Sequence, residues 1–474
     1  MNHKRGESRT QAALFPVMLD DLVGAESLVR VIDAWVNSLD LKSLGFDKTH
    51  PKVMGRPPYD PADLLKLYVC GYLNGVRSSR ALERECQRNV EVMWLLGRLS
   101  PDHKTIADFR RQNADALVAA SAAFVQFARR EQLIRGEVVA VDGSKILAVA
   151  SRKALGKVED VQQARQEISR QIQTYLAKLD AADQEDTSPS LKQGSVKAAL
   201  SRLQQRQAEL DDELVRLQET RANMSVQTEP QARAMKSLHG APGYNLQTAV
   251  DENSHLIIHH EVCNDTSDIS QLGPMAQAAA AVLQSAPVIV ADAGYANGEH
   301  LQTLVDAGLT AYVAPAHGTN PAGGGKHYNR IDFTYDTERD CYVCPANQLL
   351  LRKQIMTREK CTVYAAPATV CSNCFRKPEC TDGKQRFVSR HFNQVAVEAN
   401  MRRVTQRPDM MKLRRSTVEH PFATIKHQIL RNARLLLRGL RGARAELGLA
   451  VLGYNIKRLT NMQGNGWAIA KLQA

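Results

Sequence analysis

The stretch EVVAVDGSKI at Glu137–Ile146 predicts a buried strand that carries a carboxylate to its end. Its three valines are β-branched, and such residues favour a covered, pleated backbone. Asp142 follows where the strand is expected to leave the core, and Gly143 lets the chain pass close to whatever the carboxylate holds. We therefore expect an acidic side chain at the end of this strand.

The same pattern returns in PVIVADAGYANG at Pro287–Gly298, where three β-branched residues lead to Asp292 and a glycine-containing turn. A third acid, Glu419, lies in RRSTVEHPFATIKHQIL at Arg414–Leu430, whose apolar residues recur at helical spacing. A single aspartate at a strand end is most often a turn or cap residue. Two strands and a helix that each supply a carboxylate are what a divalent-cation site for phosphoryl transfer needs.

The composition limits the class of protein. The chain has 474 residues, which is enough for two to four domains or for large insertions. Its formal net charge of +12 favours a polyanionic partner, with nucleic acid as the leading candidate. No apolar segment of about eighteen residues could span a bilayer. The N-terminus also lacks the apolar core of a secretory signal, so we exclude a membrane protein and expect the chain in the cytosol.

The first quarter of the sequence is predicted to be almost entirely helical. A helix begins at Asp60, a break follows at Gly75, and a second helix begins near Ser78 and carries Arg80 and Arg84. A helix, a short glycine turn and an arginine-bearing helix resemble a helix-turn-helix arrangement, in which these arginines would meet DNA. A helical bundle with solvated arginines fits the same spacing equally well.

The region after the first strand predicts a helical hairpin and then a mixed sheet. Two apolar stripes within Val158–Leu217 predict an antiparallel pair of helices that separates the first strand from the next ones. A β-hairpin follows at Tyr244–Val250 and Leu256–Val262. Helices and strands then alternate as far as Ala314, which predicts a mixed sheet with helices packed on it.

Most of the nine cysteines crowd into one segment of a chain that has no secretion signal, which argues against a disulfide framework. Cys341 and Cys344 form one CxxC pair, Cys371 and Cys374 form another, and Cys380 is a nearby fifth thiol. Two such pairs separated by under about thirty residues suit tetrahedral zinc. We expect a structural zinc ribbon, and a cluster of reduced cysteines is the alternative.

These motifs together resemble those of DDE transposases of bacterial insertion sequences. The resemblance covers nearly the whole chain and rests on the blocks DLLKLYVCGYLNGVRSSRALE, VAVDGSKI, GYNLQTAVD, VIVADAGYANG, the cysteine segment and STVEHPFATIKHQ. It implies an α/β protein with an RNase H-like mixed sheet flanked by helices, an all-α N-terminal domain, a helical-hairpin insertion and a zinc-ribbon-like insertion.

The domains expected from this arrangement divide the chain into six segments. They are a helical N-terminal DNA-binding domain at 1–131, the first part of the catalytic core at 132–155, a helical hairpin insertion at 156–235, the second part of the core at 236–318, a cysteine-rich insertion at 319–400, and the catalytic helix with a basic helical tail at 401–474.

The resemblance also implies roles for individual residues. Asp142, Asp292 and Glu419 would be the catalytic residues and would hold two Mg²⁺ or Mn²⁺ ions. Lys426 lies two turns after Glu419 in the sequence, and it and Arg415 could meet DNA phosphates.

Basic residues continue beyond this helix, and their density, including Arg431 and Arg434, favours phosphate contacts over a merely solvated helix face. One feature departs from the family pattern. Related transposases often carry a tyrosine about two turns before the glutamate, whereas this chain has Met411 and Lys412 there, so we assign no tyrosine role.

The function implied by the resemblance is metal-dependent cleavage at transposon ends, followed by transfer of the 3′-hydroxyl into target DNA. The partners would be double-stranded DNA, namely terminal inverted repeats and target, and a second copy of the chain in a synaptic homodimer. The expected location is the bacterial cytoplasm, in association with the nucleoid. Two alternatives are a non-catalytic, zinc-containing DNA-binding protein or repressor derived from a transposase, and a structure-specific nuclease that cleaves without joining.

Overall fold

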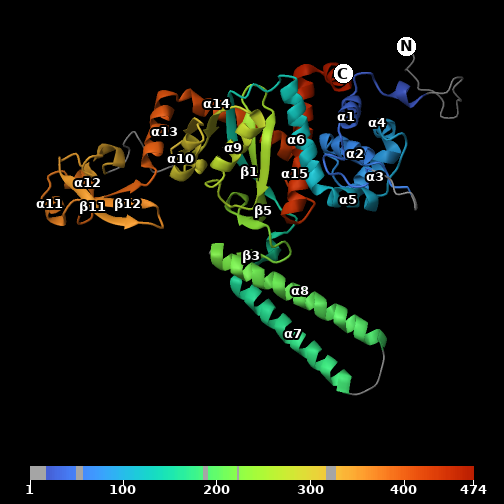
Figure 1. Cartoon of the computed structure of the whole chain (residues 1–474), viewed down its shortest axis with the longest axis horizontal. Helices are drawn as coiled ribbons and strands as arrows, with labels where there is room; N and C mark the ends of the chain where they lie inside the picture. Colours follow the sequence, from blue (N-terminus) through green and yellow to red (C-terminus); the bar gives the residue numbers. More distant parts are fainter. Residues whose placement is uncertain (1–17, 50–56, 185–189, 221–223, 316–326) are drawn as a thin grey trace, which may run out of the picture.

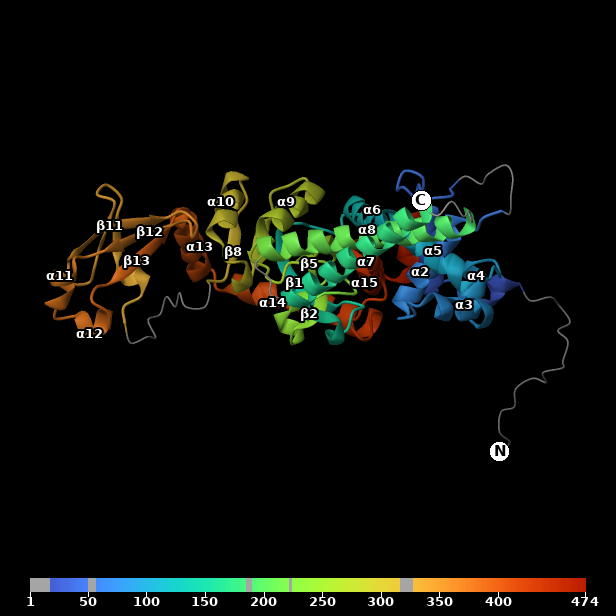
Figure 2. The ribbon, with the colours of Figure 1, turned by 90° about the horizontal axis from the view of Figure 1, so that it is seen from below.

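The structure is a computed structural model, and it describes residues 18–49, 57–184, 190–220, 224–315 and 327–474. The molecule is elongated: N-terminal helices, a central sheet with its helices, and the cysteine-bearing segment follow one another along its long axis (Figures 1 and 2). A pair of long helices projects from the middle (Figure 1). No helix in these ranges is long and apolar enough to cross a membrane.

The central sheet is mixed and has six strands. They are β1 (Val138–Leu147), β4 (Arg233–Met235), β5 (Ala241–Asp251), β6 (Ile257–Cys263), β7 (Val288–Ala291) and β8 (Ala311–Val313). Strand β5 pairs antiparallel with β1 on one side and with β4 and β6 on the other. Strands β1, β7 and β8 run parallel to one another. This strand order is consistent with an RNase H-like core, and the predicted β-hairpin is confirmed as β5 and β6.

The first predicted strand is longer than expected. It was predicted to end at Asp142, but β1 continues to Leu147 because its antiparallel partner β5 continues beside it, with Asp142 opposite Thr248. The parallel pairing with β7 does stop early, at Ala140 opposite Val290. Asp142 therefore lies just past the point where the two parallel strands separate.

Helices cover both faces of this sheet. On one face α9 (Leu272–Leu283) and α10 (Gly298–Asp306) pack in an apolar cluster that includes Val139 and Val141. On the other face α14 (Asp409–Ala423) packs on Ala140 and Val290. Since side chains alternate along a strand, Asp142 shares the face of Ala140 and points towards α14. The alternation of helices and strands predicted as far as Ala314 is confirmed by α9, β7, α10 and β8.

Two buried asparagines form hydrogen bonds with backbone groups of the outer strands of the sheet. Asn455 on α15 (Gly439–Gln463) accepts from the Ile257 backbone at 2.9 Å and donates to the Ile257 carbonyl at 2.9 Å. Asn400 on α13 (Gln394–Gln406) pairs with Val313 in the same way, at 2.9 and 2.8 Å. Unpaired strand edges invite pairing with other chains, and these side chains block part of each edge.

The N-terminal helices share a core with the sheet. They are α1 (Leu28–Asn37), α2 (Pro61–Leu73), α3 (Ser79–Arg88), α4 (Val90–Leu95), α5 (His103–Gln112) and α6 (Ala114–Arg130). Asp60 caps α2 and Ser78 caps α3, as predicted. Helix α15 packs against α2, α6 and β6, so one apolar cluster joins the N-terminal helices to the sheet (Figure 1). The C-terminal α16 (Asn465–Gln473) packs on α1.

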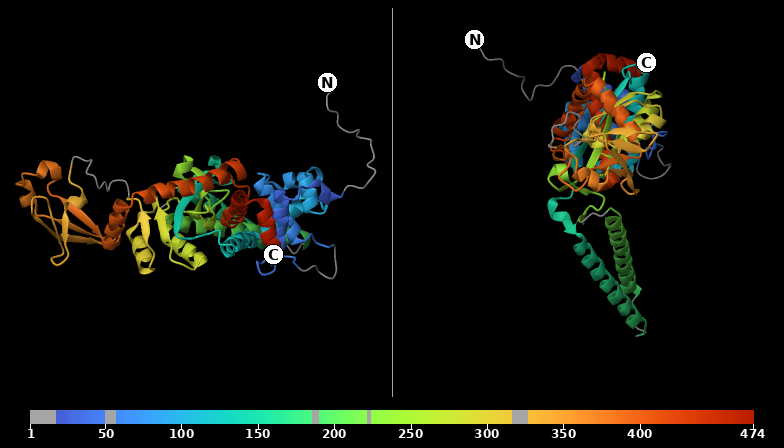
Figure 3. Two further views of the ribbon diagram at one scale, coloured as in Figure 1. Left: turned by 90° about the horizontal axis from the view of Figure 1, so that it is seen from above. Right: turned by 90° about the vertical axis from the view of Figure 1, so that its left-hand side faces the viewer.

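The predicted helical hairpin is present as a projecting arm. It consists of α7 (Val158–Gln184) and α8 (Ser190–Thr220), and it stands away from the body of the molecule (Figure 3). A small apolar cluster around Val161, Leu210 and Leu217 holds the two helices together. Two short paired strands, β2 (Leu155–Lys157) and β3 (Met224–Val226), join the arm to the core.

The cysteine-bearing segment forms its own five-stranded antiparallel sheet. Its strands are β9 (Thr334–Asp336), β10 (Cys341–Val343), β11 (Leu349–Met356), β12 (Cys361–Ala365) and β13 (Phe387–His391), and two short helices, α11 (Ala368–Ser372) and α12 (Lys377–Cys380), lie between β12 and β13. The domain boundary predicted between residues 318 and 319 lies outside the described residues.

Candidate active site

The structure brings two of the three predicted acids together. Asp142 and Asp292 each lie two residues beyond Ala140 and Val290, the last paired residues of the adjacent parallel strands β1 and β7. Asp142 is the more enclosed, with 18% of its side chain exposed against 43% for Asp292. Because neighbouring strands lie about 4.8 Å apart, this register places the two carboxylates side by side, just beyond the parallel pairing of β1 with β7.

Arg414 of α14 joins the two carboxylates. Its Nη2 lies 2.7 Å from Oδ2 of Asp142 and 3.4 Å from Oδ2 of Asp292, and 16% of its side chain is exposed. The remaining oxygens accept backbone hydrogen bonds at 2.8 Å, from Gly143 to Asp142 and from Gly294 to Asp292. A positive group thus already bridges the two acids.

The electrostatics mark Asp142 as unusual. Burial raises the pKa of Asp142 to about 6, since the charged form loses contact with water there. The Arg414 guanidinium opposes this increase, whereas the Asp292 carboxylate adds to it. Carboxylates with strongly shifted pKa values cluster at functional sites, which favours this edge of the sheet as the reactive centre.

A buried polar network supports the backbone beside Asp142, and the sequence reasoning missed it. Asp268 accepts hydrogen bonds from Lys145 at 2.7 Å, from Asn245 at 2.8 Å and from Gln247. Gln247 in turn accepts from the buried Tyr295 hydroxyl. Polar residues at alternate positions of the buried strand β5, Asn245 and Gln247, were the available signal, because buried polar side chains need partners.

Gly143 is needed for this network to approach β1. A Cβ atom at position 143 would lie 2.2 Å from the amide nitrogen of Gln247 and 2.6 Å from a carboxylate oxygen of Asp268. Real Cβ atoms essentially never come this close, so a side chain at position 143 would displace Gln247 and Asp268 from this network. The glycine therefore permits the close approach of Gln247 and Asp268. The predicted approach to a group held by Asp142 stays a prediction.

Glu419 lies on α14 but makes no recorded contact with the aspartates. It is exposed, and among the described residues no hydrogen bond or ion pair joins it to Asp142 or Asp292. In the same ranges, no group of three or more His, Cys, Asp or Glu side chains is already arranged to hold a metal ion. The structure thus pairs two of the acids and leaves the third on the helix that supplies Arg414.

The helix changes its winding soon after Glu419. Pro421 has no N–H, so it cannot donate to the Thr417 carbonyl, and the His255 ring lies 3.4 Å from that oxygen instead. A π-helical turn, η6 (Thr424–Ile429), follows. Single π turns within helices are rare and are frequent at functional sites.

Lys426 sits in this π turn and lies within electrostatic reach of Asp142. Burial lowers the pKa of Lys426, and the negative charge of Asp142 opposes that decrease. Arg415 is exposed at the surface of α14, as a phosphate contact requires. Lys426 thus lies near Asp142, whereas Arg415 lies at the surface of α14.

The comparisons with known proteins identify the family. A family model described as "Transposase DDE domain" matches residues 204–456, which is more than half of the chain. The chain belongs to the DDE transposases. A second model, described as "Transposase domain (DUF772)", matches residues 17–112, and the resemblance inferred from the sequence is confirmed. No curated protein and no solved structure matches the chain.

The matched segment of this transposase includes Asp292 and Glu419 but not Asp142. It begins within α8, the second helix of the arm that separates β1 from the other strands. Asp142 is nevertheless part of the same sheet, because its strand β1 pairs with β5 and β7 of the matched segment. Residues far apart in the transposase chain thus meet through strand pairing.

Two predicted DNA contacts of the transposase have internal partners. The Arg434 guanidinium donates to the carbonyls of Ala148, Val149 and Ala150 at 3.0 to 3.4 Å. Arg431 donates to the Asn74 carbonyl at 2.7 Å. Nη1 of Arg434 therefore holds the backbone that follows β1.

The predicted DNA contacts of the N-terminal region remain at the surface. Arg80 and Arg84 are exposed on α3, and Arg80 borders a shallow hollow with His103 and Lys104. This exposure suits either the helix-turn-helix interpretation or a solvated face, so the two interpretations remain open.

The cysteines of the transposase separate into two groups. Cys344, Cys371, Cys374 and Cys380 line one small cavity between the second sheet and the two short helices. Cys341 does not line it. It is fully buried in β10, where alternation points it away from the face of Tyr342 and Cys344. The structure thus places Cys380, instead of Cys341, with the other three predicted thiols.

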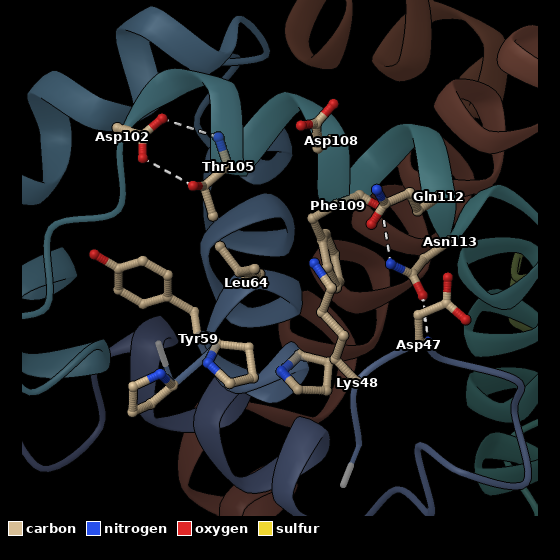
Figure 4. Close-up of a pocket in the computed structure, with 13 residues that line it drawn as sticks. Asp47, Lys48, Tyr59, Leu64, Asp102, Thr105, Asp108, Phe109, Gln112 and Asn113 are labelled. Carbon is tan, nitrogen blue, oxygen red and sulfur yellow. Dashed lines mark hydrogen bonds between the residues drawn. The ribbon is translucent and has the colours of Figure 1, made fainter. Parts of the chain in front are cut away.

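A cavity of about 580 Å³ lies in the N-terminal region, far from these groups in the fold (Figure 4). Asp47, Tyr59 and Phe109 are among its lining residues, and Asp102 caps α5 at its rim through Thr105 (Figure 4). Residues 50–56, which connect two of its walls, lie outside the described ranges. We therefore assign this cavity no ligand.

Proposed function

We propose that this transposase cleaves DNA at transposon ends and transfers the resulting 3′-hydroxyl into target DNA. Asp142, Asp292 and Glu419 are the proposed ligands of two Mg²⁺ or Mn²⁺ ions. The observation that carries the proposal is the pairing of Asp142 with Asp292 through Arg414, on the helix that also bears Glu419. Family membership supports a transposase that acts on DNA.

The donor atoms suit hard divalent cations, which prefer carboxylate oxygens. The Arg414 guanidinium bridges both aspartates, so a positive group fits between their oxygens. Metal binding would require Arg414 to withdraw and Glu419 to turn towards the strands. When bound, the cations would stabilise charge on the attacking and leaving oxygens of the phosphoryl transfer.

The chain's own residues bind and orient the DNA in this proposal. Arg415 and Lys426 neutralise backbone phosphates next to the carboxylates, and such contacts position DNA without reading its sequence. The exposed Arg80 and Arg84 are proposed to contact the terminal inverted repeats. Two transposon ends must be held together for joining, so we propose a homodimer in the synaptic complex.

The proposal is tested with labelled DNA that carries the terminal inverted repeats flanking the gene. We expect Asp142→Ala, Asp292→Ala and Glu419→Ala to lower cleavage and joining by about 10²–10³-fold or more, with DNA binding retained. Asp409→Ala is the matched control, because Asp409 is an exposed acid on the same helix that pairs with Arg407. That variant should keep wild-type activity.

Three outcomes would contradict the proposal. Normal cleavage by Asp142→Ala would reject the site. Cleavage by the wild-type protein without joining would indicate a structure-specific nuclease, and binding without cleavage in Mg²⁺ or Mn²⁺ would indicate a non-catalytic DNA-binding protein.

A further inference from the structure

The cysteine-bearing segment has little apolar core for its size. Its buried cluster consists of only six residues, Phe333, Tyr342, Leu350, Tyr364, Ala366 and Val388. Units this small are usually stabilised by disulfides or by a metal, since their cores alone contribute little free energy. All nine cysteines are free, so no disulfide stabilises the segment.

The burial of side chains contributes even less to the stability of the two short helices in this segment. Helix α11 has five residues and α12 has four, and neither contains a buried residue. Isolated helices of this length are not stable in water. The features that these helices present to the sheet are thiols: Cys371 on α11, Cys374 just after it, and Cys380 at the end of α12.

These three thiols meet Cys344, which follows β10, around one cavity of about 30 Å³. That volume is sufficient for a water molecule or a single ion. Cys371, Cys380 and Cys344 also pack against the apolar cluster of the sheet. The Cys344 sulfur accepts a hydrogen bond from the Gln348 backbone at 3.3 Å, a contact that stabilises negative charge on sulfur.

The charges around the cavity fit a metal thiolate cluster. The thiols of Cys344, Cys371, Cys374 and Cys380 line the same cavity, and as thiolates they would need a cation among them. Lys377 and Arg386 also line the cavity and would offset the remaining negative charge of such a cluster.

We propose that Cys344, Cys371, Cys374 and Cys380 bind one Zn²⁺ ion and that this ion fastens α11 and α12 to the sheet. Four thiolates give the tetrahedral sulfur coordination that zinc prefers, and binding releases the thiol protons to solvent. Because no three of these side chains already stand as ligands, the sulfurs must turn into the cavity as the metal binds. This ligand set replaces the Cys341 of the sequence prediction by Cys380.

The test uses the full-length protein and does not depend on its activity on DNA. Zinc content is measured by elemental analysis, and Co²⁺ substitution is followed by its absorption spectrum, which reports tetrahedral thiolate ligation. We expect one zinc per chain in the wild type and loss of stoichiometric zinc in Cys374→Ser and Cys380→Ser. Chelation should make the segment around α11 and α12 sensitive to protease.

Cys341→Ser and Cys361→Ser are the matched controls, because both residues lie on strands of the same sheet and outside the cavity. Both variants should retain one zinc. Circular dichroism of each variant checks that it is folded. Wild-type protein without zinc, or loss of zinc in folded Cys341→Ser with retention in Cys380→Ser, would overturn the proposal.

Discussion

At the scale of single residues, the surroundings of Asp142 determine how readily its carboxyl group ionises. The carboxylate is largely enclosed, it faces Asp292, and its pKa is raised to about 6 mainly by burial. Arg414 relieves part of this cost by contacting both acids. The proposed divalent cation would add positive charge beside these acids and favour their ionised forms.

This raised pKa predicts how cation binding depends on pH. The native state binds more protons than the unfolded state between about pH 4 and 6, so the metal-free protein should lose stability as pH rises through that window. Cations need the ionised form, so below pH 6 their apparent affinity should fall by up to about tenfold per pH unit. Thermal unfolding with and without Mg²⁺ at pH 5 and pH 8 measures both effects.

Asp142→Asn provides the control for this prediction. It should show no Mg²⁺-induced increase in melting temperature at either pH, because it lacks the ligand and the titrating group. An equal Mg²⁺ effect on the wild type at pH 5 and pH 8 would argue against Asp142 as the group that binds the cation.

At the scale of elements, a buried ion pair connects parts of the chain that are far apart in sequence. Arg77, between α2 and α3, contacts Glu446 of α15 at 2.7 Å, and the two side chains are 7% and 0% exposed. Arg77 also donates to the Leu430 and Arg434 carbonyls. The other Glu446 oxygen accepts from the Leu436 backbone at 2.7 Å. The pair thus fixes the chain that follows η6 between the N-terminal helices and α15.

We predict that Glu446→Ala lowers the free energy of unfolding by about 3–5 kcal/mol, because it leaves the buried Arg77 charge without its partner. Asp115→Ala is the matched control. Asp115 pairs with Arg441 at the start of α15, but the two side chains are 80% and 60% exposed, so its loss should cost less than about 1 kcal/mol. Urea unfolding measures both variants, and similar small losses would show that the buried pair adds no more than a surface pair.

At the scale of the whole molecule, the arm is the most separable part. Its helices pack on each other, and the chain enters and leaves through the paired strands β2 and β3, where Lys157 lies opposite Met224. The two strands that lead into and out of the arm therefore lie side by side at its base, and the arm projects away from the rest of the molecule (Figure 3).

We predict that residues 158–223 can be replaced by a two-residue Asn-Gly turn, which suits an antiparallel pair such as β2 and β3. The shortened protein should keep its fold, with its melting temperature changed by only a few degrees, because the arm contributes little to the main core. Circular dichroism and thermal unfolding check this. A protein that no longer unfolds cooperatively would show that the arm is part of the core.

The sequence by itself determined the local features of this transposase: the strands that lead to the two aspartates, the capped helices, the helical arm and the β-hairpin. Such features depend on side-chain periodicity and capping within short stretches, which are visible in order along the chain. Only the tertiary structure decided that β1 continues past Asp142, that Arg414 bridges the two acids, and that Arg434 binds backbone carbonyls. It also decided which thiols share a cavity. These features depend on strand register and on contacts between residues far apart in sequence, and no local pattern encodes them.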